Sequence, residues 1–254
     1  MMETLPKQTV RWFIALVPLY LLFFLFLDQP VDRWARAAFS DTGVKSFGSF
    51  LSLLASGPYV TLALTLGFVA GIAGVIANQG KGRPWTAAVF YVCVSCAIGI
   101  VIGEGLKYLL ARARPVELFD HGTYGFFFFS DEYNLNSTPS GHTIRIFSLM
   151  TALSVLFPRG RLLFLGLAAL VGASRVVVTA HYPSDVLFGA FIGVFAALWA
   201  CRLKGGAGEG VEGCQAEGQE MFPSGSASES QSGSAPPPGP QRTALRKQTT
   251  DEHG

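Results

Sequence analysis

The sequence predicts an all-α, polytopic integral membrane protein with six transmembrane helices. Half of its 254 residues are hydrophobic, only 14% are charged, and the mean hydropathy is +0.40. This composition is too apolar for a soluble domain. Apolar runs also recur along the chain, close to the roughly 17 to 25 residues that cross a bilayer as a helix. Short loops that carry Lys and Arg separate several of these runs, as expected of a chain that crosses repeatedly.

The expected helices follow from the apolar runs in order. The second, third and sixth runs are clear, and the first is short but uninterrupted. The fourth and fifth runs reach full length only when their polar ends are included. In chain order, the six expected membrane helices cover residues 12–27, 58–77, 85–106, 143–157, 162–178 and 183–201.

The last part of the chain differs in composition from the rest. Residues 205–254 contain 10 Gly, 6 Ser and 5 Pro, and Phe222 is their one aromatic residue. A segment of this kind buries too little apolar surface to offset the entropy lost on ordering. It carries 3 basic and 7 acidic residues, whereas residues 1–204 carry 16 and 10. We therefore expect a basic membrane domain at 1–204 and a disordered, acidic, cytoplasmic tail at 205–254.

Loop charges predict the orientation, because Lys and Arg of short loops stay on the cytoplasmic side. With six crossings, most loop cations fall on one side, which places both termini in the cytoplasm. Residues 28–57, 107–138 and 179–182 then lie on the opposite side. The cations of the cytoplasmic side are Lys7, Arg11, Lys81, Arg83, Arg159, Arg161, Arg202 and Lys204.

Three groups of polar residues stand at helix ends on the predicted non-cytoplasmic side. In the first group, Lys107 and Arg114 are seven residues apart. Both would face the same way on a helix that Pro115 ends. Their ordinary interpretation is a pair of interfacial cations that reach toward the headgroups.

The second group, Pro139-Ser140-Gly141-His142, directly precedes the fourth run. Ser140 is the expected N-cap, and the backbone N–H groups of Gly141 and His142 would point outward. Such a helix start binds anions through its free donors and its dipole. The ordinary interpretation is a capped helix with an interfacial histidine.

The third group lies between the fifth and sixth runs and consists of Arg175, His181 and Asp185. Pro183 suits the first turn of the sixth helix, which would bring Asp185 close enough to hydrogen-bond the imidazole of His181. A carboxylate on one ring nitrogen leaves the other nitrogen as a base or nucleophile. Arg175 would supply a third cation.

These groups together favour phosphate chemistry. Ionisable residues at membrane depth indicate function by default, and planar Arg forks with Lys are typical of phosphate binding. Fixed cations and backbone donors stabilise the charge of phosphoryl transfer without Mg²⁺. In phosphoryl transfer with two histidines, the one that attacks must start neutral and the one that donates a proton must start protonated. This requirement predicts a bell-shaped dependence of the catalytic rate on pH.

The three groups carry a resemblance to a known family. In chain order, the motifs are Lys107-x6-Arg114-Pro115, Pro139-Ser140-Gly141-His142 and Ser174-Arg175-x5-His181-x3-Asp185. In order and internal spacing, they resemble the complete signature of the type 2 phosphatidic acid phosphatase superfamily. The resemblance covers residues 1–204 and leaves the tail unmatched. It implies a membrane phosphatase with six helices that uses no metal or other cofactor.

The resemblance also implies a role for each motif residue. His181 would attack phosphorus, Asp185 would orient it, and His142 would protonate the leaving oxygen. The implied substrates are undecaprenyl pyrophosphate, phosphatidylglycerol phosphate, phosphatidic acid or a lipid A phosphate, at the periplasmic face of a bacterial inner membrane. The residues expected to hold the phosphoryl oxygens are Lys107, Arg114, Ser140, Gly141 and Arg175.

Three features lie outside the motifs. Arg145, on the first turn of the fourth helix, is expected either to contact the headgroup as a fourth cation or to pack against lipid phosphates at the rim. Glu104 is expected to pair with Lys107 or another buried cation. The aromatic run from Phe126 to Phe129 would dip into the membrane interface, where it lines the lipid's path or folds onto the helix ends.

Two alternatives to a phosphatase stay open. A phosphotransferase would pass the phosphoryl group from His181 to another lipid or a sugar. A transporter or channel would use the same charges to line an ion path, but it would not need all three motifs together. The expected partners are a membrane lipid phosphate and the bilayer, with no nucleic acid.

Overall fold

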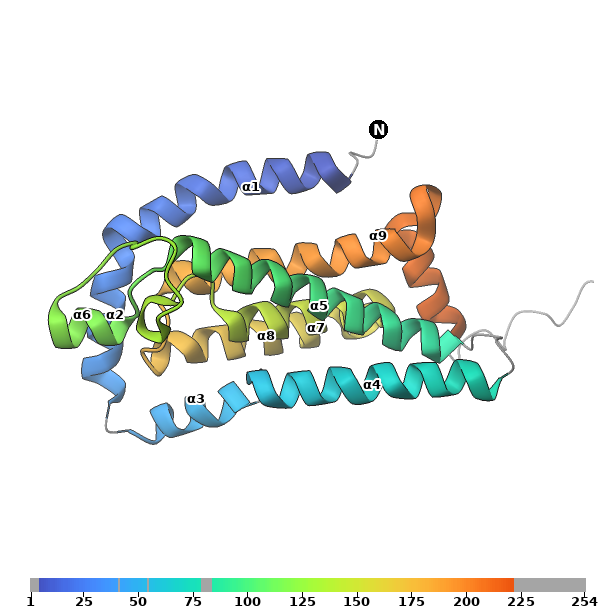
Figure 1. The fold of residues 1–254 in the computed structure, drawn as a ribbon, viewed down its shortest axis with the longest axis horizontal. Coiled ribbons are helices and arrows are strands. Elements are labelled where there is room, and N and C mark those ends of the chain that lie inside the picture. The colour runs from blue at the N-terminus through green and yellow to red at the C-terminus, as the bar shows by residue number, and fades with distance from the viewer. Residues whose placement is uncertain (1–4, 41, 54, 79–83, 222–254) are drawn as a thin grey trace, which may run out of the picture. The chain divides into compact units, whose positions relative to one another are not determined.

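Helices form the described part of the chain, as the sequence predicts (Figure 1). The structure is a computed structural model, and the helices belong to one unit, Met1–Phe222. Within the described ranges there is no strand, and β pairing is limited to an isolated bridge between Arg112 and Phe126. The described ranges are residues 5–40, 42–53, 55–78 and 84–221.

The helices follow one another with short connections. They are α1 (Leu5–Leu22), α2 (Asp28–Phe39), α3 (Gly43–Leu53), α4 (Gly57–Ala77), α5 (Pro84–Leu110), α6 (Pro115–His121), α7 (Gly141–Leu156), α8 (Arg161–Val177) and α9 (Pro183–Met221). A π-helical turn, Phe23–Leu27, joins α1 directly to α2. Single 3-10 turns occur at Tyr133–Leu135 and Pro158–Gly160.

All six predicted membrane runs are helical. Five stretches are long and apolar enough to cross a bilayer. α7 covers the fourth run but has only 16 residues. A helix of that length rises about 24 Å, less than the roughly 30 Å of a hydrocarbon core. The five longer stretches are Leu5–Phe39, Gly43–Ala77, Trp85–Leu110, Pro158–Val177 and Pro183–Leu203.

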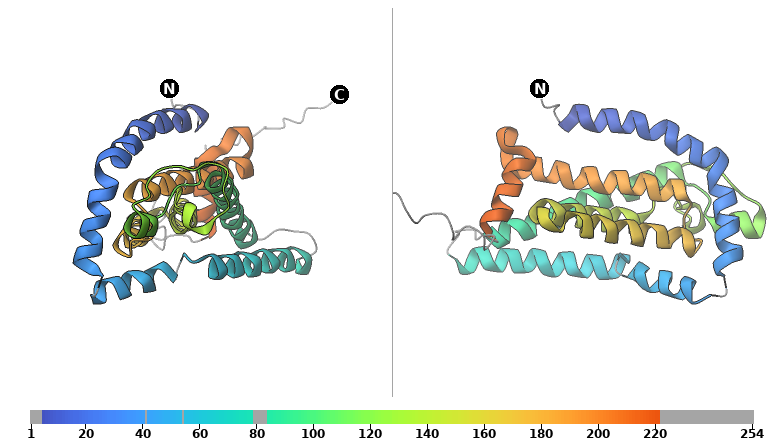
Figure 2. Two further views of the ribbon diagram at one scale, coloured as in Figure 1. Left: turned by 60° about the vertical axis from the view of Figure 1, so that its left-hand side comes forward. Right: turned by 180° about the vertical axis from the view of Figure 1, so that it is seen from behind.

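α7 is the central helix and packs against α5, α8 and α9. Its contact with α9 is close because Gly193 has no side chain, and a Cβ there would lie 2.7 Å from the Cβ of Phe147. α3 packs beside α8, and α4 packs beside α5 (Figure 2). This packing brings the ends of α5 and α8 together with the starts of α7 and α9.

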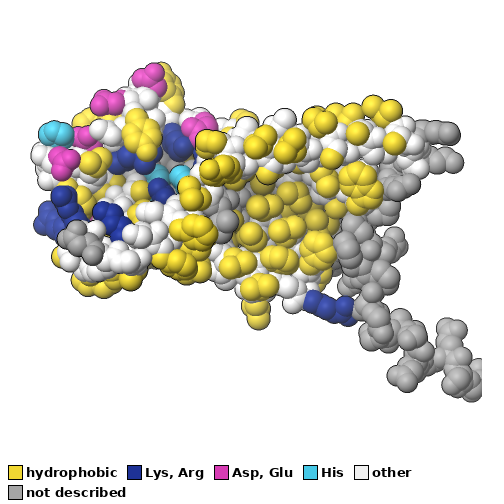
Figure 3. Space-filling view, turned by 90° about the horizontal axis from the view of Figure 1, so that it is seen from below, with side chains coloured by type: hydrophobic (Ala, Val, Ile, Leu, Met, Phe, Trp, Pro, Cys, Tyr) yellow, Lys and Arg dark blue, Asp and Glu magenta, His cyan; other side chains and the backbone are white. Residues whose placement is uncertain are grey.

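Large hydrophobic side chains cover much of the outer surface of the helices. Ile14, Ile76 and Leu162 are 64%, 72% and 88% exposed. Figure 3 shows hydrophobic side chains over most of the visible helical surface away from the charged end. Apolar surface of this extent marks contact with a partner or a membrane, and the long apolar helices identify the membrane.

α5 ends earlier than the sequence suggests. The prediction that Pro115 ends this helix is wrong, because α5 stops at Leu110 and Pro115 begins α6. Ala111 has left-handed backbone geometry, with φ 43°. The backbone N–H groups of residues 127–129 donate to the carbonyls of residues 109–111, which the end of a helix leaves free. The loop that contains residues 127–129 therefore supplies the N–H donors that another turn of helix would have supplied.

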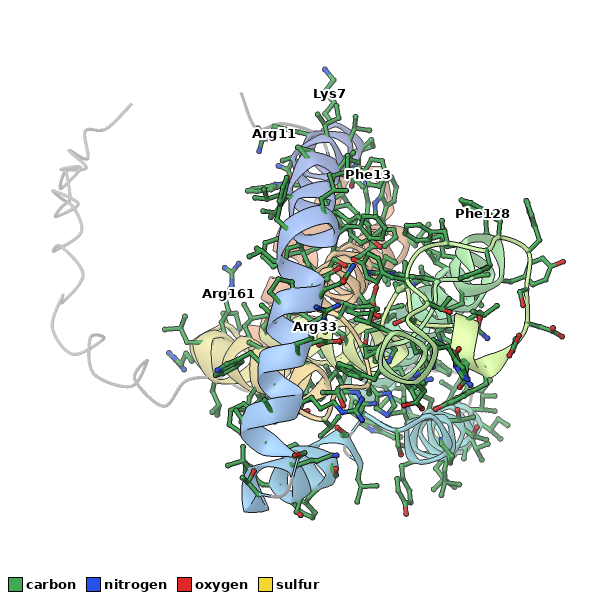
Figure 4. The ribbon with its side chains drawn as sticks, turned by 90° about the vertical axis from the view of Figure 1, so that its left-hand side faces the viewer. Lys7, Arg11, Phe13, Arg33, Phe128 and Arg161 are labelled. Carbon is green, nitrogen blue, oxygen red and sulfur yellow. The ribbon has the colours of Figure 1, made fainter. Side chains whose placement is uncertain are left out.

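The phenylalanine run lies in this loop and folds onto the end of α5, one of the two outcomes considered for it. Phe126 stacks on Phe24, with ring centroids 5.2 Å apart. The side chains of Phe127, Phe128 and Phe129 are exposed, and Figure 4 shows Phe128 on the outer side of the loop. The loop backbone thus closes α5, while three of its rings remain available to the membrane interface.

α9 continues beyond residue 204, the predicted end of the membrane domain. Its apolar stretch ends at Leu203, whereas the helix reaches Met221. The first part of the predicted disordered tail is therefore helical. Residues 222–254 lie outside the described residues.

Candidate active site

The three polar groups meet at one end of the helices. Arg114 Nη1 donates to the carbonyl of Ala180, which directly precedes His181, at 3.4 Å. The Ser140 N–H donates to the Asp185 carbonyl at 3.1 Å. Figure 3 shows Lys, Arg and His side chains gathered at this end. The first and the second motif are therefore each in direct contact with the third motif.

Lys107 lies against the start of α7. A Cβ built on Gly141 would lie 2.9 Å from Lys107 Nζ and 3.4 Å from Arg145 Nη2, so any side chain there would crowd both cations. Lys107 Nζ donates to Glu104 Oε1 at 2.7 Å, which confirms one of the predicted pairings. The Glu104 side chain is exposed, so this ion pair stands at the rim of the site.

Arg114 is fixed by backbone carbonyls. Because α5 ends early, Arg114 does not share a helical face with Lys107 but takes the N-cap position of α6. Its Nε donates to the carbonyl of Tyr133 at 2.9 Å, and its Nη2 to that of Asn136 at 3.2 Å. The guanidinium also lies over the Tyr133 ring, 4.3 Å from the centroid. These contacts hold the cation in one orientation before any ligand binds.

Ser140 occupies the N-cap position of α7, as predicted, but its hydroxyl does not cap the helix. Ser140 Oγ instead accepts a hydrogen bond from Thr143 Oγ1 at 3.0 Å. The first N–H groups of a helix, here those of Gly141 and His142, have no partner within it and carry the positive end of its dipole. An anion beside Lys107 therefore also meets the start of α7.

His181 is oriented by a backbone carbonyl. Its Nδ1 lies 2.8 Å from the Ser137 carbonyl oxygen, and the residue is 2% exposed. A carbonyl oxygen only accepts hydrogen bonds, so Nδ1 carries the proton and Nε2 of the neutral ring has a free lone pair. Asp185 is close, but its Oδ2 lies 4.0 Å from Nδ1. The predicted hydrogen bond from the imidazole to Asp185 is therefore wrong.

Asp185 does not reach the ring because other donors occupy its carboxylate. These donors are Arg112 Nη1 at 2.5 Å, Ser137 Oγ at 2.6 Å, the Tyr182 N–H at 3.0 Å, and Thr138 Oγ1. Ser137 consequently links the two motif residues. Its hydroxyl donates to Asp185, and its carbonyl accepts from His181.

Arg112, which is not part of the three motifs, is the centre of a buried network of ion pairs and hydrogen bonds. Besides Asp185, it pairs with Asp28, whose Oδ2 lies 2.7 Å from Arg112 Nη2. Asp28 also accepts hydrogen bonds from the Ser184 N–H at 3.0 Å and the Ser184 hydroxyl at 2.5 Å. The start of α2 is therefore tied to the start of α9. Rings whose centroids lie 4.3–5.7 Å from the guanidinium are those of Phe24, Tyr124, Phe126 and Tyr182.

Arg112 and Asp28 were not predicted as site residues, although each gives a signal in the sequence. Arg112 stands two residues before Arg114, but the motif spacing uses only the second arginine. Asp28 ends the first apolar run, where an acid is costly unless it is paired. Their pairing itself has no local signal, since the two residues are 84 positions apart.

The electrostatics of the site keep His181 neutral. Burial has the largest effect on the pKa of His181, followed by the charges of Arg114 and Arg175, and together they lower it well below its ordinary value. At neutral pH the ring is therefore uncharged. Arg175 Nε is buried and has no hydrogen-bond partner among the described residues, so it is free to bind a ligand.

Positive side chains dominate the site. In the described part of the chain, no three or more His, Cys, Asp or Glu side chains are grouped so that they could hold a metal ion. The two buried carboxylates nearest the site, Asp28 and Asp185, are both engaged by Arg112. An arrangement of cations, helix donors and two histidines suits an anionic group that undergoes phosphoryl transfer.

The sequence matches the PAP2 superfamily over residues 88–208, a segment that contains all three motifs. A protein of Rhizobium etli named lipid A 1-phosphatase is 33% identical over 203 residues, which cover 75% of this chain and 84% of that protein. The chain belongs to the PAP2 superfamily. The resemblance of its motifs to that family is thereby confirmed.

Other similarities of this PAP2 protein are more distant. A Sulfolobus acidocaldarius protein named undecaprenyl-diphosphatase is 33% identical over 113 residues, which cover 44% of this chain and 52% of that protein. The crystal structure of Aquifex aeolicus LpxE has the same fold, with a TM-score of 0.50 and 21% identity. It covers 68% of this chain and 94% of the other.

Proposed function

We propose that this PAP2 protein removes phosphate from a membrane lipid through a phosphohistidine intermediate and without a metal ion. The geometry of His181 carries the proposal. The ring is buried, the Ser137 carbonyl holds its Nδ1 at 2.8 Å, and Nε2 remains as a nucleophile. Arg114 and Arg175 lie close enough for their charges to act on it.

In the first step, His181 Nε2 attacks phosphorus, and the bond between phosphorus and the lipid oxygen breaks. His142 takes up a proton as the anionic phosphate binds among the surrounding cations, and it gives that proton to the lipid oxygen. The new N–P bond leaves the imidazole positively charged, and the Ser137 carbonyl stabilises it through Nδ1–H. Asp185 acts through Ser137 and Arg112, so it is a positioning residue.

In the second step, water attacks phosphorus, the N–P bond breaks, and His142 accepts the proton of the water. Inorganic phosphate leaves, and both histidines return to their starting protonation states. In both steps the charge on the phosphoryl oxygens is held by fixed donors, which need no reorganisation as the charge develops. We assign this role to Lys107, Arg114, Ser140, Gly141 and Arg175.

The proposed substrate is a lipid whose phosphate stands at the membrane surface. The cations gather at one end of the helices (Figure 3). The exposed rings of residues 127–129 belong to the loop that closes the end of α5, three residues beyond Lys107. A headgroup can therefore reach the cations while the acyl chains stay in the bilayer. Lipid A 1-phosphate is the first candidate, because the similarity to lipid A 1-phosphatase extends over most of both chains. Undecaprenyl diphosphate, phosphatidylglycerol phosphate and phosphatidic acid complete the set to be tested.

We further propose that the chain crosses a bacterial inner membrane six times, with α7 as the fourth crossing, both termini in the cytoplasm and the site facing the periplasm. Lys7 and Arg11 near the start of α1, and Arg161 at the start of α8, support this orientation (Figure 4). Lys81 and Arg83 lie outside the described residues.

A membrane-impermeant thiol reagent tests the orientation in intact cells. It should label Asp131→Cys, in the exposed loop beside the site, but not Arg159→Cys at the other end of α8. Labelling of Arg159→Cys alone would reverse the proposed topology.

Phosphate release tests the function. The purified full chain in detergent should release phosphate from at least one of the four lipids. His181→Ala should fall below about a thousandth of that rate, a loss typical of removing a catalytic group. His121→Ala is the matched control, because the partner of that exposed histidine of α6 among the described residues is Glu117, at 2.9 Å.

A labelled intermediate tests the mechanism separately. With substrate labelled in the scissile phosphate, protein quenched in alkali should carry the label, and His181→Ala should not. Release of phosphate by His181→Ala at a substantial rate, or an equal amount of label on both proteins, would refute the assignment of the nucleophile.

A further inference from the structure

We propose that Arg145 and the junction of α3 and α4 form a second anion subsite beside the catalytic phosphate. The ligand of this subsite is a second phosphate attached to the scissile one, as in a lipid diphosphate. The inference rests on the proposed function. Among its four candidate lipids, the subsite favours undecaprenyl diphosphate over lipid A 1-phosphate, the lipid that sequence similarity places first.

Arg145 is anchored at one nitrogen and free at the other. Its Nη1 donates to the carbonyl of Ala55 at 3.1 Å. Its Nη2 lies 3.4 Å from the position of a Cβ on Gly141 and 3.5 Å from that of a Cβ on Gly57. The guanidinium thus spans the space between the start of α7 and the start of α4. The Ala55 contact fixes its orientation without using the nitrogen that faces Gly141.

Within the described ranges, Arg145 has no carboxylate of its own, because Glu104, whose charge also acts on Arg145, is paired with Lys107. Among the described residues no carboxylate forms an ion pair with it, whereas Lys107 is paired with Glu104 at 2.7 Å. Arg145 is partly buried, and a desolvated cation without a counter-charge is unfavourable. A bound anion would supply the missing counter-charge.

The position of this free nitrogen sets where the second anion lies. Lys107 Nζ and Arg145 Nη2 both approach Gly141. They lie 2.9 Å and 3.4 Å from the position that a Cβ on Gly141 would occupy. Lys107 belongs to the motif that holds the scissile phosphoryl group. A group that Arg145 contacts is therefore a direct neighbour of that phosphoryl group, as the second phosphate of a diphosphate is.

The junction of α3 and α4 adds polar capacity on the same side. Gly57 is the first residue of α4, so its N–H and that of Tyr59 have no acceptor within the helix, whereas Pro58 has no N–H and the Val60 N–H donates to the Ser56 carbonyl at 3.0 Å. The hydroxyl of Ser56 is buried and has no hydrogen-bond partner among the described residues. A guanidinium nitrogen, a helix start and an unused hydroxyl together suit a compact, doubly charged group.

Matched substrates give the decisive experiment. We would measure kcat/KM of the full chain, Arg145→Ala and Arg145→Lys on polyprenyl diphosphate and polyprenyl monophosphate of equal chain length. Arg145→Ala should lose about tenfold more on the diphosphate than on the monophosphate, the scale of one charge-assisted hydrogen bond. Arg145→Lys should lie between, because one ammonium cannot hold both Ala55 and the second phosphate. Arg159→Ala, an exposed arginine at the other end of α8, should leave the ratio of the two rates unchanged.

A binding measurement removes the dependence on turnover and on the lipid. Methylenediphosphonate should bind the parent protein with a lower Kd than methylphosphonate in titration calorimetry, and Arg145→Ala should lose most of that difference. Ser56→Ala should lose a smaller part of it while the anchor at Ala55 stays in place.

The outcomes separate this inference from the proposed function. Equal losses on both substrates, or no preference for the diphosphonate in the parent, would overturn the subsite and leave the phosphatase intact. Absence of phosphate release by the parent from every lipid would instead refute the proposed function.

Discussion

Asp28 and Arg112, 84 residues apart in the chain, form a fully buried ion pair in which Oδ2 lies 2.7 Å from Nη2. The same guanidinium binds the carboxylate of Asp185 at 2.5 Å. One cation therefore connects an acid at the start of α2 with the acid of the third motif. Because the ion pairs are buried, each member depends on the others for its counter-charge.

Arg112→Ala should destabilise the protein strongly, since it leaves two carboxylates buried without their cation. Breaking a buried ion pair costs about 3 to 5 kcal/mol, and thermal unfolding in detergent measures the loss. Arg112→Lys should be intermediate, because an ammonium keeps the charge but lacks the fork that reaches both acids.

Arg33→Ala is the control for this series. Its guanidinium is exposed, and within the described ranges it donates to Gln29 at 3.2 Å, so the expected change is within about 0.5 kcal/mol. Similar unfolding temperatures for all three variants would contradict the importance of the buried network. If Arg112→Ala does not fold at all, a lower unfolding temperature of Arg112→Lys than of Arg33→Ala would still support the importance of the buried network.

The pH dependence of kcat/KM should report the lowered pKa of His181. The ring is a nucleophile only when neutral, so the rate falls as pH decreases through this pKa. Burial and the charges of Arg114 and Arg175 lower the pKa, so the acid limb should lie below the ordinary histidine value of about 6.5.

Arg114→Gln tests the cause of that shift. Removing a positive charge near His181 should raise the pKa and move the acid limb to higher pH, separately from any loss of phosphate binding. Arg36→Gln, which removes an exposed cation over the ring of Phe119, should not move it. An acid limb that stays in place in Arg114→Gln would show that this charge does not tune the nucleophile.

Activity should persist in EDTA and be blocked by orthovanadate. Vanadate adopts the trigonal-bipyramidal geometry of the transferring phosphoryl group, and analogues of a transition state bind more tightly than substrates. Phosphate release with and without each reagent, on the same lipid, is the measurement. Loss of activity in EDTA that Mg²⁺ restores, with no effect of vanadate, would contradict the metal-free mechanism.

The helices could be predicted from the sequence because apolar length is a property of neighbouring residues. All six runs are helical, and Glu104 pairs with Lys107 one turn away. The three motifs also predict one anion site, because each stands at the end of a helix on the same side. Contacts of this kind need no knowledge of distant packing.

Backbone partners could not be predicted, because every residue has an N–H or a carbonyl to offer. The end of α5 at Leu110 depends on N–H groups of the loop 127–129, and the orientation of His181 depends on the carbonyl of Ser137. Neither group has a side chain that marks its role. The Pro115 boundary and the expected bond from His181 to Asp185 were wrong for this reason.

The order of the amino acids was enough to predict the class of this protein, the order of its helices and the residue types of its site. The partner that each buried charge takes depends on how the chain folds. Asp185 lies near both His181 and Arg112. Its carboxylate pairs with Arg112, which also pairs with Asp28, and does not hydrogen-bond His181. The physical reason is that buried charges must be paired. The available partners depend on how the start of α2, the segment that follows α5 and the start of α9 pack together, although these segments are far apart in the chain.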